Sequence, residues 1–188
     1  MKKEIKQEVI IKANTISRRG VSLGVPLWST HYRVECYDRD GNLKWVDEFD
    51  NLVVDEGLND NLDKYFKGSN YTAAFYVGLT DGSPTVSASD TMSSHSGWNE
   101  VTAYDETSRP ALTLGTVSNK SVDNSENKAQ FTINADNTTI GGAFVTTDST
   151  KGGTTGTLYG VGAFSAGDKT LDNGDILQVA ITLTASAS

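Results

Sequence analysis

The feature that most constrains this chain is a hairpin signal centred on Asp40-Gly41, in the stretch YRVECYDRDGNLKWVDEF. Apolar runs lie on both sides of this pair, and Asp-Gly suits the two positive φ values of a type I′ turn. A two-residue loop would set the strands in one register, with the pairs Cys36–Trp45, Tyr32–Phe49 and, on the opposite face, Arg33–Glu48. A slip of one residue would send the aromatic side chains into water. The stretch therefore predicts antiparallel β-structure, although Asp47 interrupts its apolar row.

One amphipathic helix is predicted directly after this hairpin, over about 55–67. Its apolar residues recur at i, i+4, i+7 and i+8 and so form one face. They are Leu58, Leu62, Tyr65 and Phe66. Asp55 can cap the start of the helix, and Gly68 can stop it.

Short apolar segments separated by turn-forming residues predict the other strands. They cover 72–80, 111–117, 129–133, 140–146, 158–164 and 176–183. The last segment alternates as a half-buried strand does, and we expect it to belong to a closing hairpin within 165–185, with 184–188 frayed. Residues 81–98 form a long polar loop, anchored by Trp98. The predicted fold class is all-β, a β-sandwich or jelly-roll-like domain with one short α-helix.

Residues 1–30 differ in composition from the rest of the chain. They carry six Lys and Arg against two Glu, a net charge of +4, whereas the remaining residues carry −12. We therefore predict an extended basic N-terminal arm over 1–30 and a single β-sandwich domain over 31–188. Such a segment can become ordered on a partner. The predicted partner-binding residues are Ile5, Val9, Ile10, Ile11, Arg18, Arg19 and Trp28. A solubilising tail and an ordinary first strand are the alternatives.

Composition argues against several functional classes. The acidic body argues against nucleic-acid binding by the folded domain. Nothing is long and apolar enough to span a membrane, and the N-terminus lacks the apolar region of a signal peptide. The lone cysteine, Cys36, excludes an internal disulfide framework and fits assembly in a reducing cytoplasm.

No motif predicts catalysis, a metal or a cofactor. The sequence DRDGN (38–42) departs from the order of an EF-hand loop and fits a turn better. A cluster of Asp90, Ser93, Ser94 and His95 contains the residue types of a hydrolase triad, but neighbours on one loop do not make a preorganised triad. We therefore expect a protein that is not an enzyme. Exposed aromatic residues could instead form a sugar-binding or subunit interface, or pack in the core. The candidates are Trp28, Trp98, Tyr71, Tyr104 and Tyr159.

Four stretches together resemble a family of small virion proteins of tailed bacteriophages. They are VECYDRDGNLKWVDEFDNLVVDEGLN, FYVGLTDGSPTVSASDTMSSHSGWNEVTAYDETSRPAL, SVDNSENKAQFTINADNTTIGGAFVTT and KGGTTGTLYGVGAFSAGDKTLDNGDILQVAITLT. The resemblance covers roughly residues 33–184 and leaves the arm uncovered. It implies a β-sandwich component of a virion without enzymatic activity, and it carries over no catalytic residues.

Three hypotheses follow for the function. The first is a capsid decoration (cement) protein, assembled in the host cytoplasm, whose arm binds the major capsid protein or other virion proteins; a homo-oligomer, for example a trimer, would suit symmetric lattice points. The second is a receptor- or carbohydrate-binding module of a tail or head fibre, with a site on the loop 81–98. The third is a structural protein of the neck or tail tube.

Overall fold

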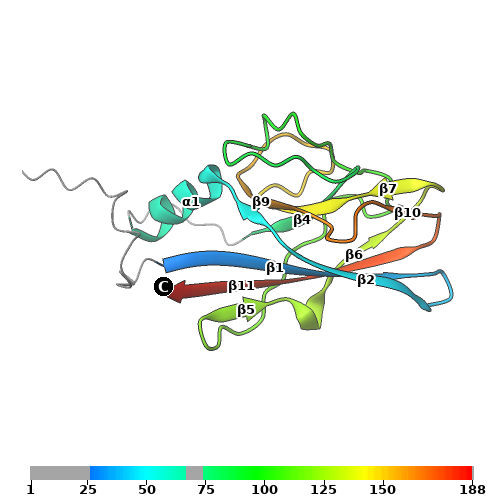
Figure 1. Cartoon of the computed structure of the whole chain (residues 1–188), viewed down its shortest axis with the longest axis horizontal. Coiled ribbons are helices and arrows are strands. Elements are labelled where there is room, and N and C mark those ends of the chain that lie inside the picture. The colour runs from blue at the N-terminus through cyan, green and yellow to red at the C-terminus, as the bar shows by residue number, and fades with distance from the viewer. Residues whose placement is uncertain (1–25, 67–73, 188) are drawn as a thin grey trace, which may run out of the picture.

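The two longest strands, β1 (Pro26–Tyr37) and β11 (Ile176–Ala187), pair antiparallel along 12 residues and form the middle of the larger sheet. The computed structural model describes residues 26–66 and 74–187. β2 (Leu43–Asp50) lies beside β1 at one edge. On the other side, β11 pairs with two short strands, β5 (Ser121–Asp123) and β6 (Ala129–Thr132). Figure 1 shows β1 and β11 running side by side along the length of the domain.

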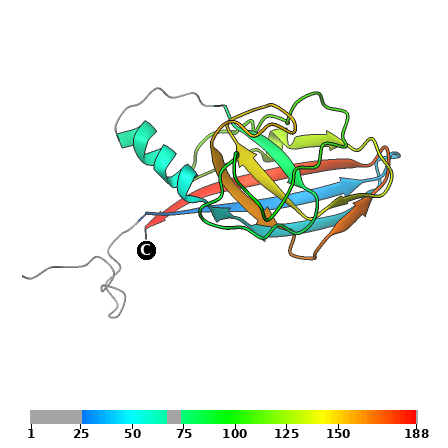
Figure 2. The same ribbon diagram turned by 90° about the horizontal axis from the view of Figure 1, so that it is seen from above.

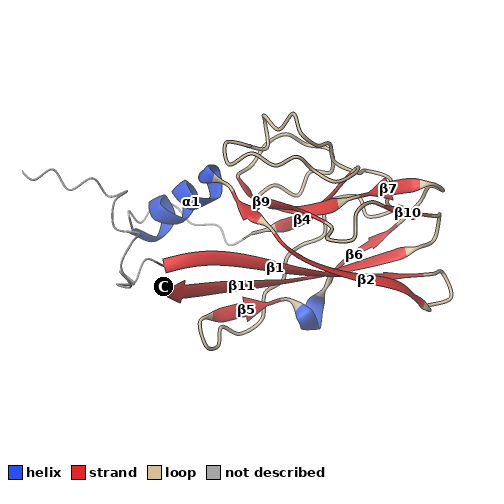
Figure 3. Ribbon diagram, in the orientation of Figure 1, coloured by secondary structure: helices blue, strands red, loops and turns tan. Residues whose placement is uncertain are grey.

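A second antiparallel sheet packs against the first. Its order is β3 (Leu52–Val53), β9 (Leu158–Ala163), β8 (Gly142–Thr146) and β4 (Tyr76–Thr80). A separate pair joins β7 (Thr138–Ile140) to β10 (Lys169–Leu171). The sheets, with one short α-helix among the described residues, α1 (Asp55–Asn61), confirm the predicted all-β sandwich (Figures 2 and 3). No helix in the described ranges is long and apolar enough to cross a membrane.

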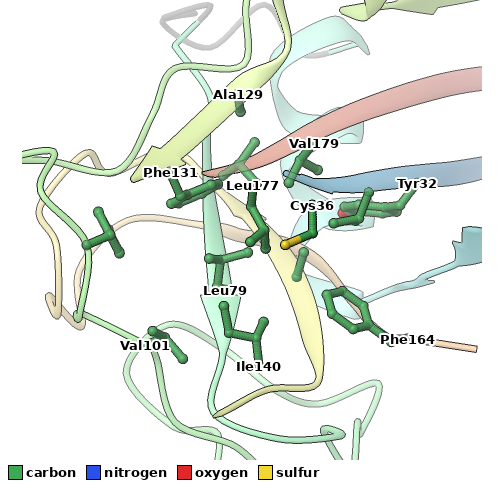
Figure 4. Close-up of a cluster of buried hydrophobic side chains, with 14 of the residues drawn as sticks. Tyr32, Cys36, Leu79, Val101, Ala129, Phe131, Ile140, Phe164, Leu177 and Val179 are labelled. Atoms are coloured by element: carbon green, nitrogen blue, oxygen red, sulfur yellow. The ribbon is translucent and has the colours of Figure 1, made fainter. Parts of the chain in front are cut away.

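The core lies between the two sheets, where inward-facing side chains of both meet. Figure 4 shows Tyr32 and Cys36 of β1 near Leu177 and Val179 of β11, with Leu79 of β4 opposite them. All five are fully buried. Burial, followed by the nearby Asp175 carboxylate, raises the pKa of the Cys36 thiol to about 12. Cys36 is therefore a packing residue of the core.

The register of the predicted hairpin is confirmed, but its loop is not a two-residue type I′ turn. All three predicted residue pairs face each other. The strand ends pair as Tyr37–Leu43, so the loop is one residue longer, and a bulge at Lys44 restores the register. Only Gly41 of the loop has positive φ, at 83°. Asp38 explains the difference, because its carboxylate accepts bonds from the backbone N–H groups of Asp40 and Asn42 at 2.9 and 2.8 Å.

The predicted helix exists, but its cap and its packing face differ from expectation. Val54, not Asp55, occupies the N-cap position, and no side chain caps the helix. After Asn61 the chain continues as a π-helical turn, η2 (Leu62–Phe66). The helix packs through Gly57, which approaches the Tyr159 backbone so closely that an added Cβ would lie 2.9 Å from its carbonyl oxygen. Gly68 lies outside the described residues.

Three predicted strands occur close to their expected bounds, as β6, β9 and β11. Residues 140–146 are instead divided between β7 and β8, which belong to different sheets. The predicted strand 111–117 is wrong. Its start bonds beside β4, through Leu112 N–H to Phe75 O, and its middle bonds beside β5, through Gly115 N–H to Asp123 O. The segment crosses between the sheets and forms a ladder with neither.

The predicted closing hairpin is also wrong, because β10 pairs with β7 while β11 pairs with β1. The expected frayed end is in fact the last part of β11, which stays paired with β1 as far as Pro26–Ala187. It follows that residues 26–30, which we assigned to the arm, belong to the sheet. The rest of the arm, 1–25, lies outside the described residues.

Candidate interaction surface

An apolar groove of about 210 Å³ opens at the end of the sandwich where β1 begins. Its walls come from both sheets and from the segments beside the helix. Its apolar and aromatic lining residues are Trp28, Tyr32, Val53, Phe75, Leu112, Leu114, Val145, Tyr159 and Leu183. Four polar residues complete it: Ser29, Thr30, Asn51 and Asn61. A concave, largely apolar site with a few polar groups is the usual form of a binding site in proteins.

The groove arises from a mismatch in strand length. β1 and β11 have 12 residues each, whereas β4, β8 and β9 have five or six. Inward-facing residues of β1 that lie over the second sheet, such as Tyr32, are fully buried. Trp28 has the same inward orientation, four residues earlier along the strand, and is 52% exposed. The larger sheet therefore extends beyond the smaller one and leaves its inner face uncovered by described residues.

The helix adds exposed apolar side chains at this end. Leu58 and Leu62 lie on the predicted apolar face and are 38% and 56% exposed, and Leu52 of β3 is 44% exposed. The amphipathic face therefore exists, but these two leucines do not enter the core. The side chains of Tyr65 and Phe66, predicted on the same face, lie outside the described part. Leu52, Leu58 and Leu62 do not line the groove themselves; they lie on the segments next to it.

Two polar groups are built into the groove. The Asn51 side chain donates a long hydrogen bond to the Tyr32 hydroxyl at 3.4 Å, while its Oδ1 atom is buried with no hydrogen-bond partner among the described residues. The Tyr159 hydroxyl donates to an Asp60 carboxylate oxygen at 2.8 Å. Burial raises the pKa of Tyr32 above its usual range, so this hydroxyl stays neutral. Within the described part of the chain, Asn51 Oδ1 is thus an unsatisfied acceptor that is enclosed by protein atoms.

Of the predicted partner-binding residues, the structure describes one. Trp28 lies in β1, exposed at the mouth of the groove. Ile5, Val9, Ile10, Ile11, Arg18 and Arg19 lie outside the described residues. Sequence analysis missed Asn51 and Leu183 as parts of this surface. The periodicity of β11 placed Leu183 on the inner face, but no local signal shows that the opposite sheet ends before reaching it.

The other side of the second sheet is covered by the irregular segment 81–110. Trp98 is 5% exposed and packs on Phe144 with ring centroids 4.9 Å apart, which confirms its predicted anchoring role. Together they form a small second core. Its buried members are Val54, Met92, Trp98, Phe144, Leu158 and Val161.

A buried ion pair fastens this cover. Arg109 is 1% exposed and donates to both Glu100 carboxylate oxygens, at 2.9 and 2.7 Å. It also donates to the backbone carbonyls of Asp148 and Gly153, at 2.8 and 2.7 Å. Bidentate geometry with additional carbonyl acceptors is what a buried guanidinium requires. The pair therefore joins the segment 81–110 to the loop after β8.

The titratable residues considered in the sequence make structural contacts. His95 stacks on Trp98 at 3.8 Å and its Nδ1 lies 3.1 Å from the Trp98 carbonyl oxygen. Asp90 accepts a bond from Ser87 N–H within the same loop. Asp47, the charged residue in the apolar row, accepts bonds from the backbone N–H groups of Ser165 and Ala166. In the described ranges, no group of three or more His, Cys, Asp or Glu could hold a metal ion.

Comparison with known proteins adds no relative: no family model, no curated protein and no solved structure matches this chain. The surface must therefore be interpreted from its own residues.

Proposed function

We propose that this protein is a structural component of a tailed-bacteriophage virion, and specifically a capsid decoration protein that binds the assembled head through its N-terminal arm. The observation that carries the binding role is the position of the groove. The apolar groove opens where β1 begins, a few residues after the arm segment 1–25 ends. The sequence resemblance given above supports the virion as the location.

Charge separation supports the same role. The residues before β1 carry +4, while those from Pro26 onward carry −12. A basic arm is attracted to an acidic protein surface. Copies with acidic bodies repel one another, which keeps the protein soluble. Binding of this kind needs no catalytic group.

The stabilising mechanism is thermodynamic linkage. A protein that binds the assembled lattice, and not separated subunits, shifts the equilibrium towards the lattice by mass action. Many copies on one shell, or an oligomer that engages several subunits at once, increase the effect through avidity.

Particles that lack this protein provide the test. Purified full-length protein is mixed with them and sedimented, and the bound copies and the disruption temperature of the shell are measured. We expect saturable binding in hundreds of copies and a raised disruption temperature. A few copies per particle would place the protein in the neck or tail. No binding would reject the proposal and make glycan screening the next experiment.

Two variants locate the contact. Arg18→Glu with Arg19→Glu reverses charge in the arm and should weaken binding most at low salt, because the attraction between arm and capsid is screened. Leu43→Ala is the matched control, because Leu43 is 55% exposed at the far end of β2 and should not alter binding. Equal loss in both variants would contradict an arm-mediated contact.

A further inference from the structure

We propose that the groove binds residues 5–11 of the same chain, so that in the free protein the N-terminal arm folds back onto the domain. This inference goes beyond the proposed function, because it concerns the isolated protein and does not depend on any particle.

The first argument is chemical fit. The groove is lined mainly by apolar and aromatic side chains, and residues 5–11 contain the apolar residues Ile5, Val9, Ile10 and Ile11. Burying such side chains contributes on the order of 25 cal/mol per Å² of apolar surface removed from water. The polar lining residues Ser29, Thr30 and Asn61 can serve the backbone N–H and C=O groups of an extended segment.

The second argument is charge. The helical segment beside the groove, residues 55–66, contains four carboxylates and one lysine. One of them, Asp60, accepts the hydrogen bond of Tyr159, which lines the groove. Residues 5–12 of the arm carry Lys6 and Lys12 against Glu8, a net charge of +1. Lysine side chains can bury their stems on an apolar surface while their ammonium groups reach acidic neighbours.

The third argument is reach. Residues 12–25 separate Ile11 from the first residue of β1, and an extended chain of that length spans roughly 45–50 Å. The groove begins only two residues into the strand, at Trp28. Eight of the eleven residues at positions 14–24 are polar or glycine, so the intervening chain suits a reversal of direction.

The short linker also favours binding of the chain's own arm over the arm of a second copy. A segment tethered through a short linker has an effective concentration in the millimolar range. An arm from another molecule must compete with that at the much lower concentration of the protein itself. A capsid could still draw the arm out, because many lattice contacts act together.

Paramagnetic NMR on the full chain tests the proposal. A nitroxide is attached to Gln7→Cys, next to the apolar residues; Cys36 is buried with a raised pKa and stays unlabelled. The probes are the indole N–H signals of Trp28 and Trp45. We expect loss of most of the Trp28 signal and retention of the Trp45 signal. Trp45 lies opposite Cys36, eight residues along β1 from Trp28, about 26 Å away.

A mixed sample separates the possible occupants. Nitroxide-labelled protein without nitrogen-15 is combined with nitrogen-15 protein without nitroxide. Our proposal predicts no loss of the Trp28 signal there, and loss would identify a second copy's arm and overturn it. Retention of the Trp28 signal in both samples would overturn it too, and would leave the groove to another protein.

Variants of the arm complete the test. Ile10→Asp with Ile11→Asp should restore the Trp28 signal in the labelled protein, because carboxylates do not enter an apolar groove. Arg18→Gln with Arg19→Gln is the matched control and should leave the signal loss unchanged. If the aspartate variant also leaves the loss of the Trp28 signal unchanged, the arm is held elsewhere and the proposal fails. None of these outcomes involves particle binding, so failure here and failure of the proposed function are distinguishable.

Discussion

The second sheet has apolar surface on both faces, but the two faces are treated differently. One is covered by the irregular segment 81–110, fastened by Trp98 and by the Arg109–Glu100 ion pair. The other face of the second sheet packs against the larger sheet. Where the larger sheet extends beyond the second one, no described residue fills the groove. A long irregular loop is often functional. Here it completes a core, while the exposed apolar surface is built largely from regular strands.

This difference shows where a function is best sought. The aromatic residue of the long loop is buried, so Trp98 cannot act as an exposed platform for a sugar. Trp28 of β1 is exposed because its strand extends beyond the opposing sheet. The following changes, in order of decreasing expected effect, should separate a covered surface from an open one.

Arg109→Ala should produce a large loss of stability. The substitution leaves Glu100 buried without its partner, and breaking a buried pair in this way typically costs about 3–5 kcal/mol. Chemical denaturation of the variant and the wild type measures the difference. The double variant Arg109→Met, Glu100→Met should recover much of the loss, because no unpaired charge remains. A single variant as stable as the wild type would show that the ion pair does not fasten the cover.

Two tryptophan substitutions compare the surfaces directly. Trp98→Ala removes a buried ring and should cost about 3–5 kcal/mol. Trp28→Ala, made together with Ile10→Asp and Ile11→Asp so that the groove is open, removes a half-exposed ring and should cost about 1 kcal/mol or less, the usual range for surface positions. Thermal unfolding of both variants provides the comparison. Equal costs would mean that something other than the arm covers Trp28 in solution.

Acid should loosen the covered side by a smaller amount. Hydrogen bonds from the Thr155 hydroxyl and the Thr150 backbone lower the pKa of Asp148 to about 2. Because the folded-state pKa is depressed, this stabilisation is present above the unfolded value near 3.8 and is lost as the pH falls from about 4 to 2. We expect the wild type to lose on the order of 1 kcal/mol over this interval relative to Asp148→Asn. Parallel stability curves for the two proteins would exclude this contribution.

The sequence predicted what depends on neighbouring residues. The register of the hairpin followed from alternation on both sides of one turn, and α1 followed from its periodicity. The exact loop did not, because the side chain of Asp38 stabilises a longer loop than the type I′ turn that Asp-Gly favours. Similarly, Asp47 disturbed the apolar pattern, and its partners lie more than a hundred residues away.

Pairing between distant segments could not be predicted in this way. The alternation of 176–183 identified a strand, but only the tertiary structure shows that it pairs with β1 and not with β10. The candidate surface has the same origin. Trp28 and Leu183 have the pattern of buried residues, and they are exposed to the groove because the strands opposite them are shorter.

The pairing of β1 with β11 also constrains how the protein forms. β11 lies between β1 on one side and the two short strands β5 and β6 on the other, yet it is synthesised after all of them. On a ribosome, the β1–β2 hairpin must therefore wait with one edge unpaired until the last strand emerges, and unpaired edges are prone to aggregation. Strands β1 and β11 are far apart in the sequence, and contacts between such distant segments form slowly. Folding of the larger sheet is thus a late event, completed by the strand that holds its two halves together.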